Sequence, residues 1–405
     1  MRKVLLLSLI CLCLSCNINQ PDPLLEGVWR AELQVTDTEI LPFNFEVTSR
    51  DALKIFNADE VIMVTDISYS NDTVVLKTPV FEGYIEAVVE NGKLSGNFIK
   101  ENEDRILPFK AEFGNAKRFE TKEGVSSNDI SGNWEAVFSP NSEADRYIAK
   151  GIFEQDGLTV TGTFRTTTGD YRYLEGVMDG DIMKLSTFDG AHAFLFTAKV
   201  TDSTMSGMFY SGNHWQEPFV AKRNESYELP DANNLTFLKE GYEVFEFSFP
   251  DAEGNVVSLT DNRFKNKVVV VQIMGTWCPN CLDESKYYSE FYDINAEKDL
   301  EFVALAFEYA KSEEKAFQSI KRLKDGIGIQ YPILLAQYGS SDKAEAQQKL
   351  PMLNHVLSYP TSIFIDKKGK VRKIHTGFNG PATGEKYIRF QNEFESFINQ
   401  LLDEN

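Results

Sequence analysis

Apolar and polar residues alternate in short segments from about residue 25 to residue 223, and Gly, Asn and Asp interrupt these segments. Alternation with a period of two places every second side chain on one face of a β-strand. The spacing that an amphipathic helix requires is not evident in this part of the chain. The pattern therefore predicts an all-β N-terminal region.

The β region contains an internal repeat. The segment LEGVWRA at residues 25–31 returns as ISGNWEA at residues 130–136, and KLSGNF at 93–98 returns as TMSGMF at 204–209. The period is a little over a hundred residues, which is too long for a solenoid unit. We therefore expect a tandem repeat of two small barrel or sandwich copies, or two halves of one barrel, over residues 25–117 and 130–223.

Trp29 and Trp134 open the two copies. A large aromatic residue at the start of a β unit is expected to fill its core, and the alternative is a stacking surface for a ligand. The repeats carry no recognisable catalytic constellation. A spacer or dimerisation module and a substrate-recruiting or ligand-binding module both stay open for this region.

The pattern changes near residue 238, where continuous apolar runs replace the alternation. Runs at 268–274 and 302–307 suit strands that are buried on both faces. Further strands are expected at 331–336, 361–366 and 371–375, with helices at 283–296, 311–323, 342–349 and 387–403. This alternation predicts an α/β domain over residues 238–405, with helices on both faces of a sheet.

A Cys-x-x-Cys pair, Cys278 and Cys281, lies where the first buried strand gives way to a helix. The unpaired N–H groups of a first helical turn stabilise a thiolate, so Cys278 is the expected nucleophile and Cys281 the resolving thiol. A zinc site needs about four ligands and the four histidines show no ligand spacing, so no metal is expected. A purely structural disulfide would gain little from so short a loop.

Three motifs carry a family resemblance: WCPNC at residues 277–281, YPT at 359–361 and IDKKGKV at 365–371. Together they resemble the TlpA/ResA-like family of membrane-anchored thiol-disulfide oxidoreductases. The likeness runs from near residue 240 to the C-terminus and does not reach the β repeats. It implies a thioredoxin fold that works without a cofactor other than its own Cys278–Cys281 disulfide.

The resemblance also implies roles for residues around the cysteines. Pro360 matches the cis-proline, and the backbone before it, at Tyr359, is expected to pair with a substrate segment. Glu284 matches a glutamate that tunes the protonation of the thiols, and a helix-favouring role is its alternative. Gln272 replaces thioredoxin's buried aspartate, which leaves Glu284 as the expected acid-base group. The residues expected to contact the substrate are Trp277, Tyr359, Pro360 and Thr361, whereas His375 is expected at the surface.

The N-terminus resembles a bacterial lipoprotein signal. Arg2 and Lys3 precede an apolar run at residues 4–14 that is too short to span a bilayer. The run ends in CLSC at 13–16, which resembles a lipobox and predicts a signal peptide over 1–15, lipid on Cys16 and a tether over 16–24. Ordinary cleavage that releases a soluble protein is the alternative.

The formal charge of −20 argues against binding to nucleic acid, which needs basic residues. We therefore expect a periplasm-facing lipoprotein of the cell envelope that reduces protein disulfides. Its partners would be protein thiols or disulfides and an upstream electron donor, such as a membrane thiol transporter. A peroxiredoxin-like thiol peroxidase is the alternative of a different chemistry.

Overall fold

The computed structural model of the protein describes residues 23–122, 125–126 and 128–404. The expected signal peptide and the lipidation site Cys16 lie outside the described residues. Within those three ranges, we find no helix with both the length and the apolar character needed to cross a membrane.

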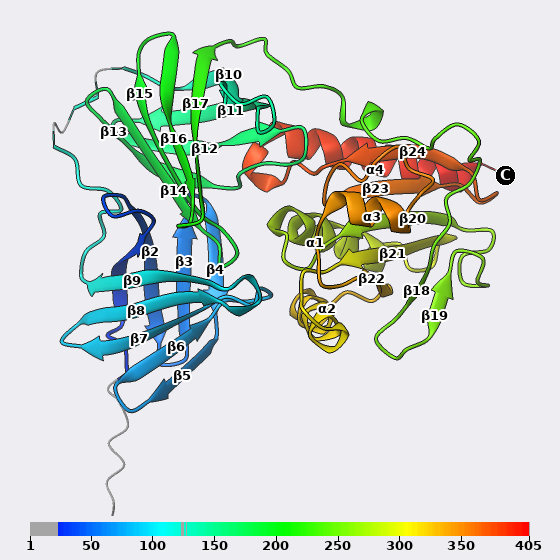
Figure 1. Cartoon of the computed structure of the whole chain (residues 1–405), viewed down its shortest axis with the longest axis horizontal. Helices are drawn as coiled ribbons and strands as arrows, with labels where there is room; N and C mark the ends of the chain where they lie inside the picture. Colours follow the sequence, from blue (N-terminus) through cyan, green and yellow to red (C-terminus); the bar gives the residue numbers. More distant parts are fainter. Residues whose placement is uncertain (1–22, 123–124, 127, 405) are drawn as a thin grey trace, which may run out of the picture.

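The first part of the chain forms an open antiparallel sheet of nine strands, which we call the first β unit (Figure 1). Its strand order is β4-β3-β2-β1-β9-β8-β7-β6-β5, so the first strand pairs with the last one in the middle of the sheet. The strands are β1 (Gly27–Gln34), β2 (Ile40–Ser49), β3 (Ala52–Asn57), β4 (Glu60–Val64), β5 (Asp66–Ser70), β6 (Thr73–Lys77), β7 (Tyr84–Glu90), β8 (Lys93–Lys100) and β9 (Arg105–Phe113).

The next part is a closed barrel of eight antiparallel strands, in which β10 pairs with β17. Aromatic rings fill it: the ring of Phe138 lies between 5.2 and 6.3 Å from those of Phe164, Phe196, Phe209 and Phe219. The strands are β10 (Gly132–Phe138), β11 (Tyr147–Asp156), β12 (Thr159–Thr166), β13 (Leu174–Asp179), β14 (Ile182–Phe188), β15 (Ala193–Val200), β16 (Thr204–Ser211) and β17 (Trp215–Arg223).

The barrel covers the apolar face of the first β unit. Phe188 of β14 stacks on Phe43 of β2, with the ring centroids 4.4 Å apart. Asn57 of β3 exchanges two hydrogen bonds with the backbone of Phe188, of 3.0 and 3.1 Å. An open sheet needs such a cover because its apolar face must leave water.

Trp29 and Trp134 are both fully buried. Each indole N–H donates to the carbonyl four residues earlier, at 2.9 Å to Leu25 and 2.8 Å to Ile130. The prediction that they fill the cores is confirmed, and neither ring is free to stack on a ligand.

The C-terminal part, which we call the redox domain, has a five-stranded mixed sheet with the order β22-β21-β20-β23-β24. Its strands are β20 (Val268–Met274), β21 (Leu300–Phe307), β22 (Ile333–Gln337), β23 (Thr361–Ile365) and β24 (Val371–Thr376), with a separate hairpin of β18 (Ser248–Pro250) and β19 (Val256–Ser258). Its helices are α1 (Pro279–Ile294), α2 (Glu313–Ile327), α3 (Lys343–Lys349) and α4 (Glu385–Asp403). Short 3-10 turns lie at Glu101–Glu103, Ala232–Asn234 and Pro381–Thr383.

The boundaries of α1 and α2 differ most from the sequence expectation. The helix expected to begin at residue 283 begins at Pro279, because Cys278 acts as its N-cap and proline suits the first helical position. The helix expected over 311–323 runs from Glu313 to Ile327, because Ser312 caps it and Gly328 ends it with a left-handed conformation.

Helices α1 and α4 pack on the same face of the sheet. The ring of Tyr288 in α1 lies 5.1 Å from that of Phe394 in α4 and 5.3 Å from that of Phe302 in β21. This aromatic layer fixes α1 against the sheet.

Candidate active site

Cys278 lies between the end of β20 and the start of α1. Its sulfur accepts a hydrogen bond from the backbone N–H of Cys281 at 3.2 Å, which makes it the N-cap of the helix. The N–H groups and the dipole at this helix end favour negative charge on the sulfur. The side chain is only 7% exposed.

Cys281 lies one helical turn further and is fully buried. Both cysteines are free thiols. Burial, followed by the hydrogen bond with Cys278, raises the pKa of the Cys281 thiol well above its ordinary value. The inner thiol therefore needs a proton acceptor before it can attack a disulfide.

A buried carboxyl group, Glu284, lies on the next turn of α1. One of its oxygens accepts from Gln272 Nε2 at 2.9 Å, and the other lies 3.0 Å from the Ser362 hydroxyl and 3.1 Å from the Tyr288 hydroxyl. Burial raises the pKa of Glu284 to about 7, although these hydrogen bonds partly oppose the shift. The carboxyl can therefore exchange a proton near neutral pH. Gln272 therefore bonds directly to this carboxyl group.

The loop before β23 lies against the cysteines. The Tyr359–Pro360 peptide bond is cis. The Cys278 thiol lies 3.4 Å from the Tyr359 carbonyl oxygen, as donor to acceptor. Thr361 differs from the expectation of a substrate contact, because it is 1% exposed and its hydroxyl donates to the Ser358 carbonyl at 2.9 Å.

Trp277 packs beside the cysteines. Its indole N–H donates to the Phe307 carbonyl at 3.0 Å, and its ring lies 5.6 Å from that of Tyr359 and 5.7 Å from that of Tyr309. The ring remains partly exposed. Trp277 is thus the part of the redox motif that both supports Tyr359 and reaches the surface.

Sequence reasoning missed a second buried carboxyl group, Glu308. It accepts from the backbone N–H of Thr276 at 2.8 Å and from the Thr276 hydroxyl at 2.7 Å, and burial raises its pKa to about 7. Glu308 directly follows β21, which runs parallel to β20. The carboxyl ends of neighbouring parallel strands meet at one edge of a sheet, so this position could have been found from the pattern.

Sequence reasoning also missed the barrel residues that cover the motif. Asn280 Nδ2 donates to the Asp170 carbonyl at 3.2 Å, and Arg172 donates to the Pro279 carbonyl at 3.3 Å. No sequence signal links these residues, because more than a hundred positions separate them.

The prediction of a surface position for His375 is wrong. The residue is half-buried, and its Nδ1 lies 2.9 Å from Asn233 Oδ1. Burial and the charge of Lys373 lower its pKa to about 3, so the ring stays neutral. The residue stands on β24, where the segment 231–234 covers that edge of the sheet.

The redox domain is similar in sequence to known proteins. The Redoxin family profile matches residues 239–387. The thiol-disulfide oxidoreductase ResA of Bacillus thuringiensis is 32% identical over 134 residues, which span 33% of this chain and 68% of that protein. ResA of Geobacillus thermodenitrificans is 30% identical over 142 residues, which span 35% and 72%.

A solved structure described as a putative protein disulfide isomerase from Bacteroides thetaiotaomicron is also similar. It is 17% identical, covers 43% of this chain and 95% of its own, and has a TM-score of 0.31. The chain belongs, through its C-terminal domain, to the ResA-like thiol-disulfide oxidoreductases of the Redoxin family, because it matches the Redoxin profile and the two ResA proteins and carries the Cys-x-x-Cys pair at a helix N-terminus.

Proposed function

We propose that this protein is an exported disulfide reductase in which Cys278 attacks and Cys281 resolves. The supporting observation is the 3.2 Å hydrogen bond from the Cys281 N–H to the Cys278 sulfur, which marks that sulfur as the one held at the helix N-terminus. The Cys278 thiolate attacks one sulfur of a protein disulfide and expels the other as a thiolate. The Cys281 thiolate then attacks Cys278, which releases the second substrate thiol and leaves a Cys278–Cys281 disulfide.

Glu284 is proposed as the base that accepts the Cys281 proton before this second step. Its pKa of about 7 suits that transfer, and the Glu284 charge is among the influences that raise the pKa of the Cys281 thiol. Trp277, Tyr359 and Pro360 are proposed to contact the substrate. Two electrons leave the dithiol in each cycle, so an upstream donor, such as a membrane thiol transporter, must return the pair to the reduced state.

Trapping of the mixed disulfide tests this assignment. The full chain carrying Cys281→Ser should accumulate a covalent adduct with a peptide disulfide, because its second step is blocked. The matched Cys278→Ser chain should form none. Equal adduct on both variants, or full turnover by either one, contradicts the assignment, and rapid peroxide consumption by the reduced chain would favour the peroxidase alternative.

Export and anchoring are part of the proposal. A signal peptide over residues 1–15, lipid on Cys16 and a tether over 16–24 would hold the protein at the cell envelope, facing the periplasm. Metabolic labelling with a radioactive fatty acid should mark the protein in cells. Cys16→Ala should abolish the label, and label that survives this change contradicts the anchor.

We further infer that residues 25–117 and 130–223 are two copies of one β unit, followed by the redox domain at 238–405. The equivalent burial and hydrogen bonding of Trp29 and Trp134 support this division. The second copy closes into a barrel, whereas the first stays open and uses the barrel as its cover.

A further inference from the structure

The loop between β12 and β13 of the barrel lies on the redox motif. We call residues 166–172 the cover loop. Gly169 forms a β-bridge with Phe378, and the Asp170 carboxylate accepts from the backbone N–H of Gly380 at 2.6 Å. The Ser358 hydroxyl, two residues before the cis-proline, donates to the Thr168 carbonyl at 2.8 Å. The cover loop therefore occupies the surface between the cis-proline loop and the segment 377–380.

Arg172 anchors the cover loop through a buried charge cluster. Its guanidinium pairs with Glu60 of the first β unit, with Asp189 of the barrel at 3.2 Å, and with Asp283 of α1. Arg172 itself is 4% exposed. Separating these units would leave charges buried without partners, which is strongly unfavourable.

The cover loop is also held from inside the barrel. The ring of Tyr171 lies 5.1 Å from that of Phe209 and 5.4 Å from that of Phe196, in the aromatic core. Since packed interiors resist displacement, the loop has support on both sides and is a fixed wall of the redox site.

The cover loop is one contact between the β region and the redox domain, and the first β unit makes a second. Phe81 is buried within the hydrophobic cluster of the redox domain. Tyr309 donates to Glu82 at 3.1 Å, and Lys311 pairs with Asp104 at 2.8 Å. The β region thus holds the redox domain at two separate places.

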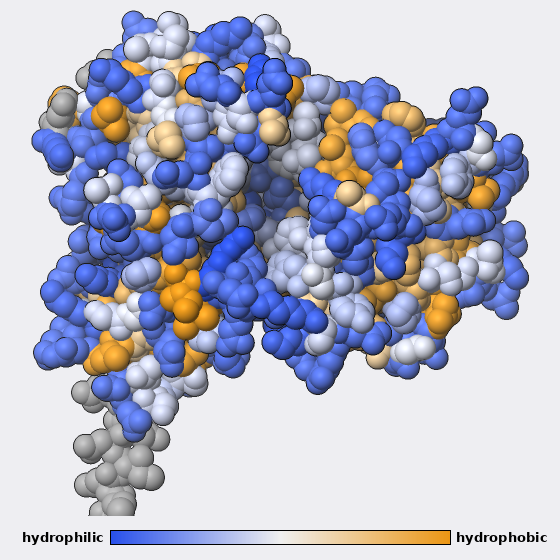
Figure 2. All heavy atoms as spheres, viewed as in Figure 1, coloured by the Kyte–Doolittle hydropathy of each residue, from blue (hydrophilic) through white to orange (hydrophobic). Residues whose placement is uncertain are grey.

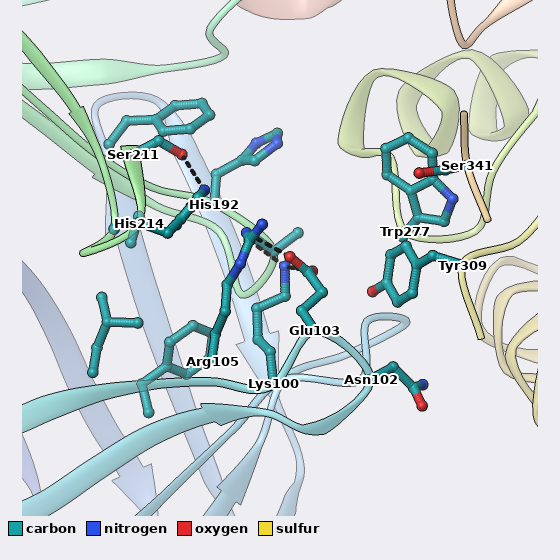
Figure 3. A pocket seen from close by; sticks show the side chains of 16 residues that line it. Lys100, Asn102, Glu103, Arg105, His192, Ser211, His214, Trp277, Tyr309 and Ser341 are labelled. Carbon is teal, nitrogen blue, oxygen red and sulfur yellow. Dashed lines mark hydrogen bonds and ion pairs between the residues drawn. The ribbon is translucent and has the colours of Figure 1, made fainter. Parts of the chain in front are cut away.

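A cleft of about 380 Å³ remains between the contacting units, and Figure 2 shows the recess between the β region and the redox domain. Trp277, the neighbour of Cys278, forms part of the redox-domain wall. Figure 3 shows Trp277 and Tyr309 facing Lys100, Arg105, His192 and His214 across this space. A volume of this size accepts a small molecule or a short piece of chain, whereas a folded domain needs a far larger surface.

On the basis of the exchange reaction proposed above, we propose that the cover loop determines substrate specificity. It blocks the motif around Pro279 and Asn280, so a disulfide reaches Cys278 only from the Trp277 side, through the cleft. The substrate class is a small disulfide, or a cystine in an extended, flexible segment. Disulfides on the flat surface of a folded domain are excluded.

Competing substrates test this assignment with the full, reduced chain. The probes are a short linear peptide disulfide and a folded protein domain with a rigid surface disulfide, matched by their reactivity toward dithiothreitol. We expect kcat/KM for the peptide to exceed that for the folded domain by at least about 100-fold. Equal values overturn the cover loop as a specificity element, whereas no reaction with either probe overturns the exchange reaction itself.

Variants of the cover loop separate specificity from stability. Arg172→Ala, confirmed as folded by circular dichroism, should raise the rate on the folded domain by about tenfold and change the peptide rate by less than about twofold. Gly169→Ala provides a second route, because a Cβ at this position would lie 2.0 Å from Asn280 Nδ2. The matched control is Gly157→Ala, where nothing lies within 4 Å of the added Cβ. Variants that accelerate neither probe, or both equally, contradict the proposal.

Discussion

Two buried glutamates flank the redox motif, and their neighbours distinguish their roles. Glu284 and Glu308 each have a pKa raised to about 7 by burial. Glu284 bonds to Gln272 beside the resolving thiol, whereas Glu308 holds the backbone of Thr276 before Trp277. We therefore propose that Glu284 transfers the proton and that Glu308 positions the backbone before Trp277.

The pH dependence of the resolving step tests Glu284. Its carboxylate forms as the pH rises through about 7, and only the carboxylate can accept the Cys281 proton. The rate of release from a mixed disulfide should therefore rise through that pH. In Glu284→Gln this rise should disappear. Above pH 7 the variant should release the mixed disulfide about 100-fold more slowly than the wild type, as measured by stopped-flow fluorescence. The control Glu308→Gln should keep the rise, and its loss there would contradict the assignment.

The same carboxyl group makes stability depend on pH. The pKa of Glu284 is raised from 4.5 to about 7 on folding, so the folded chain binds the extra proton between these values. The free energy of unfolding must therefore fall as the pH rises through this window, by about 3 kcal/mol from this group. Denaturant titrations of Glu284→Gln at several pH values should show a fall in the free energy of unfolding that is smaller by that amount than in the wild type. A profile parallel to that of the wild type would show that the group titrates normally.

At the scale of elements, the sequence located the redox pair because its signals are local. A buried run, a Cys-x-x-Cys pair and a following helix identify the strand β20 and the helix α1 without tertiary information. The first turn of α1 was missed because proline and cysteine are poor helix formers by propensity, whereas Cys278 caps this helix through its sulfur. The strand boundaries of the redox domain lie within about two residues of the expected ones. The main residue whose burial differs from the expectation is His375.

The opening strand of the barrel provides a test of packing. Trp134 is fully buried, and Arg223 lies 4.5 Å above its ring. Trp134→Ala should lower the free energy of unfolding by about 3–5 kcal/mol, because it removes a large core side chain and leaves a cavity. The matched control is Trp215→Ala on β17, where the side chain is 45% exposed and the change should stay within about 0.5 kcal/mol. If urea denaturation shows that Trp134→Ala and Trp215→Ala lower the free energy of unfolding equally, the predicted effect of burial is wrong.

At the scale of the whole molecule, the sequence did not predict how the units meet. The two β units and the redox domain follow from periodicity, but Arg172 gives no sign that it will join Glu60 and Asp283. These residues are separated by more than a hundred positions, and only the packing of complete sheets brings them together. Likewise, nothing in the alternation at residues 73–90 indicates that Phe81, in the connection between β6 and β7, packs into the redox core.

The shared core predicts that the units unfold together. Because Phe81 is buried in the redox domain, the free energy of one unit depends on the other, and we expect a single calorimetric transition for the full chain. Phe81→Ala removes about 3–5 kcal/mol of this coupling and should separate the transition into two. The control Phe237→Ala, at a side chain that is 55% exposed, should leave one transition. Two transitions in the wild type would mean that the contacts between the units are too weak to hold the cover loop on the redox motif.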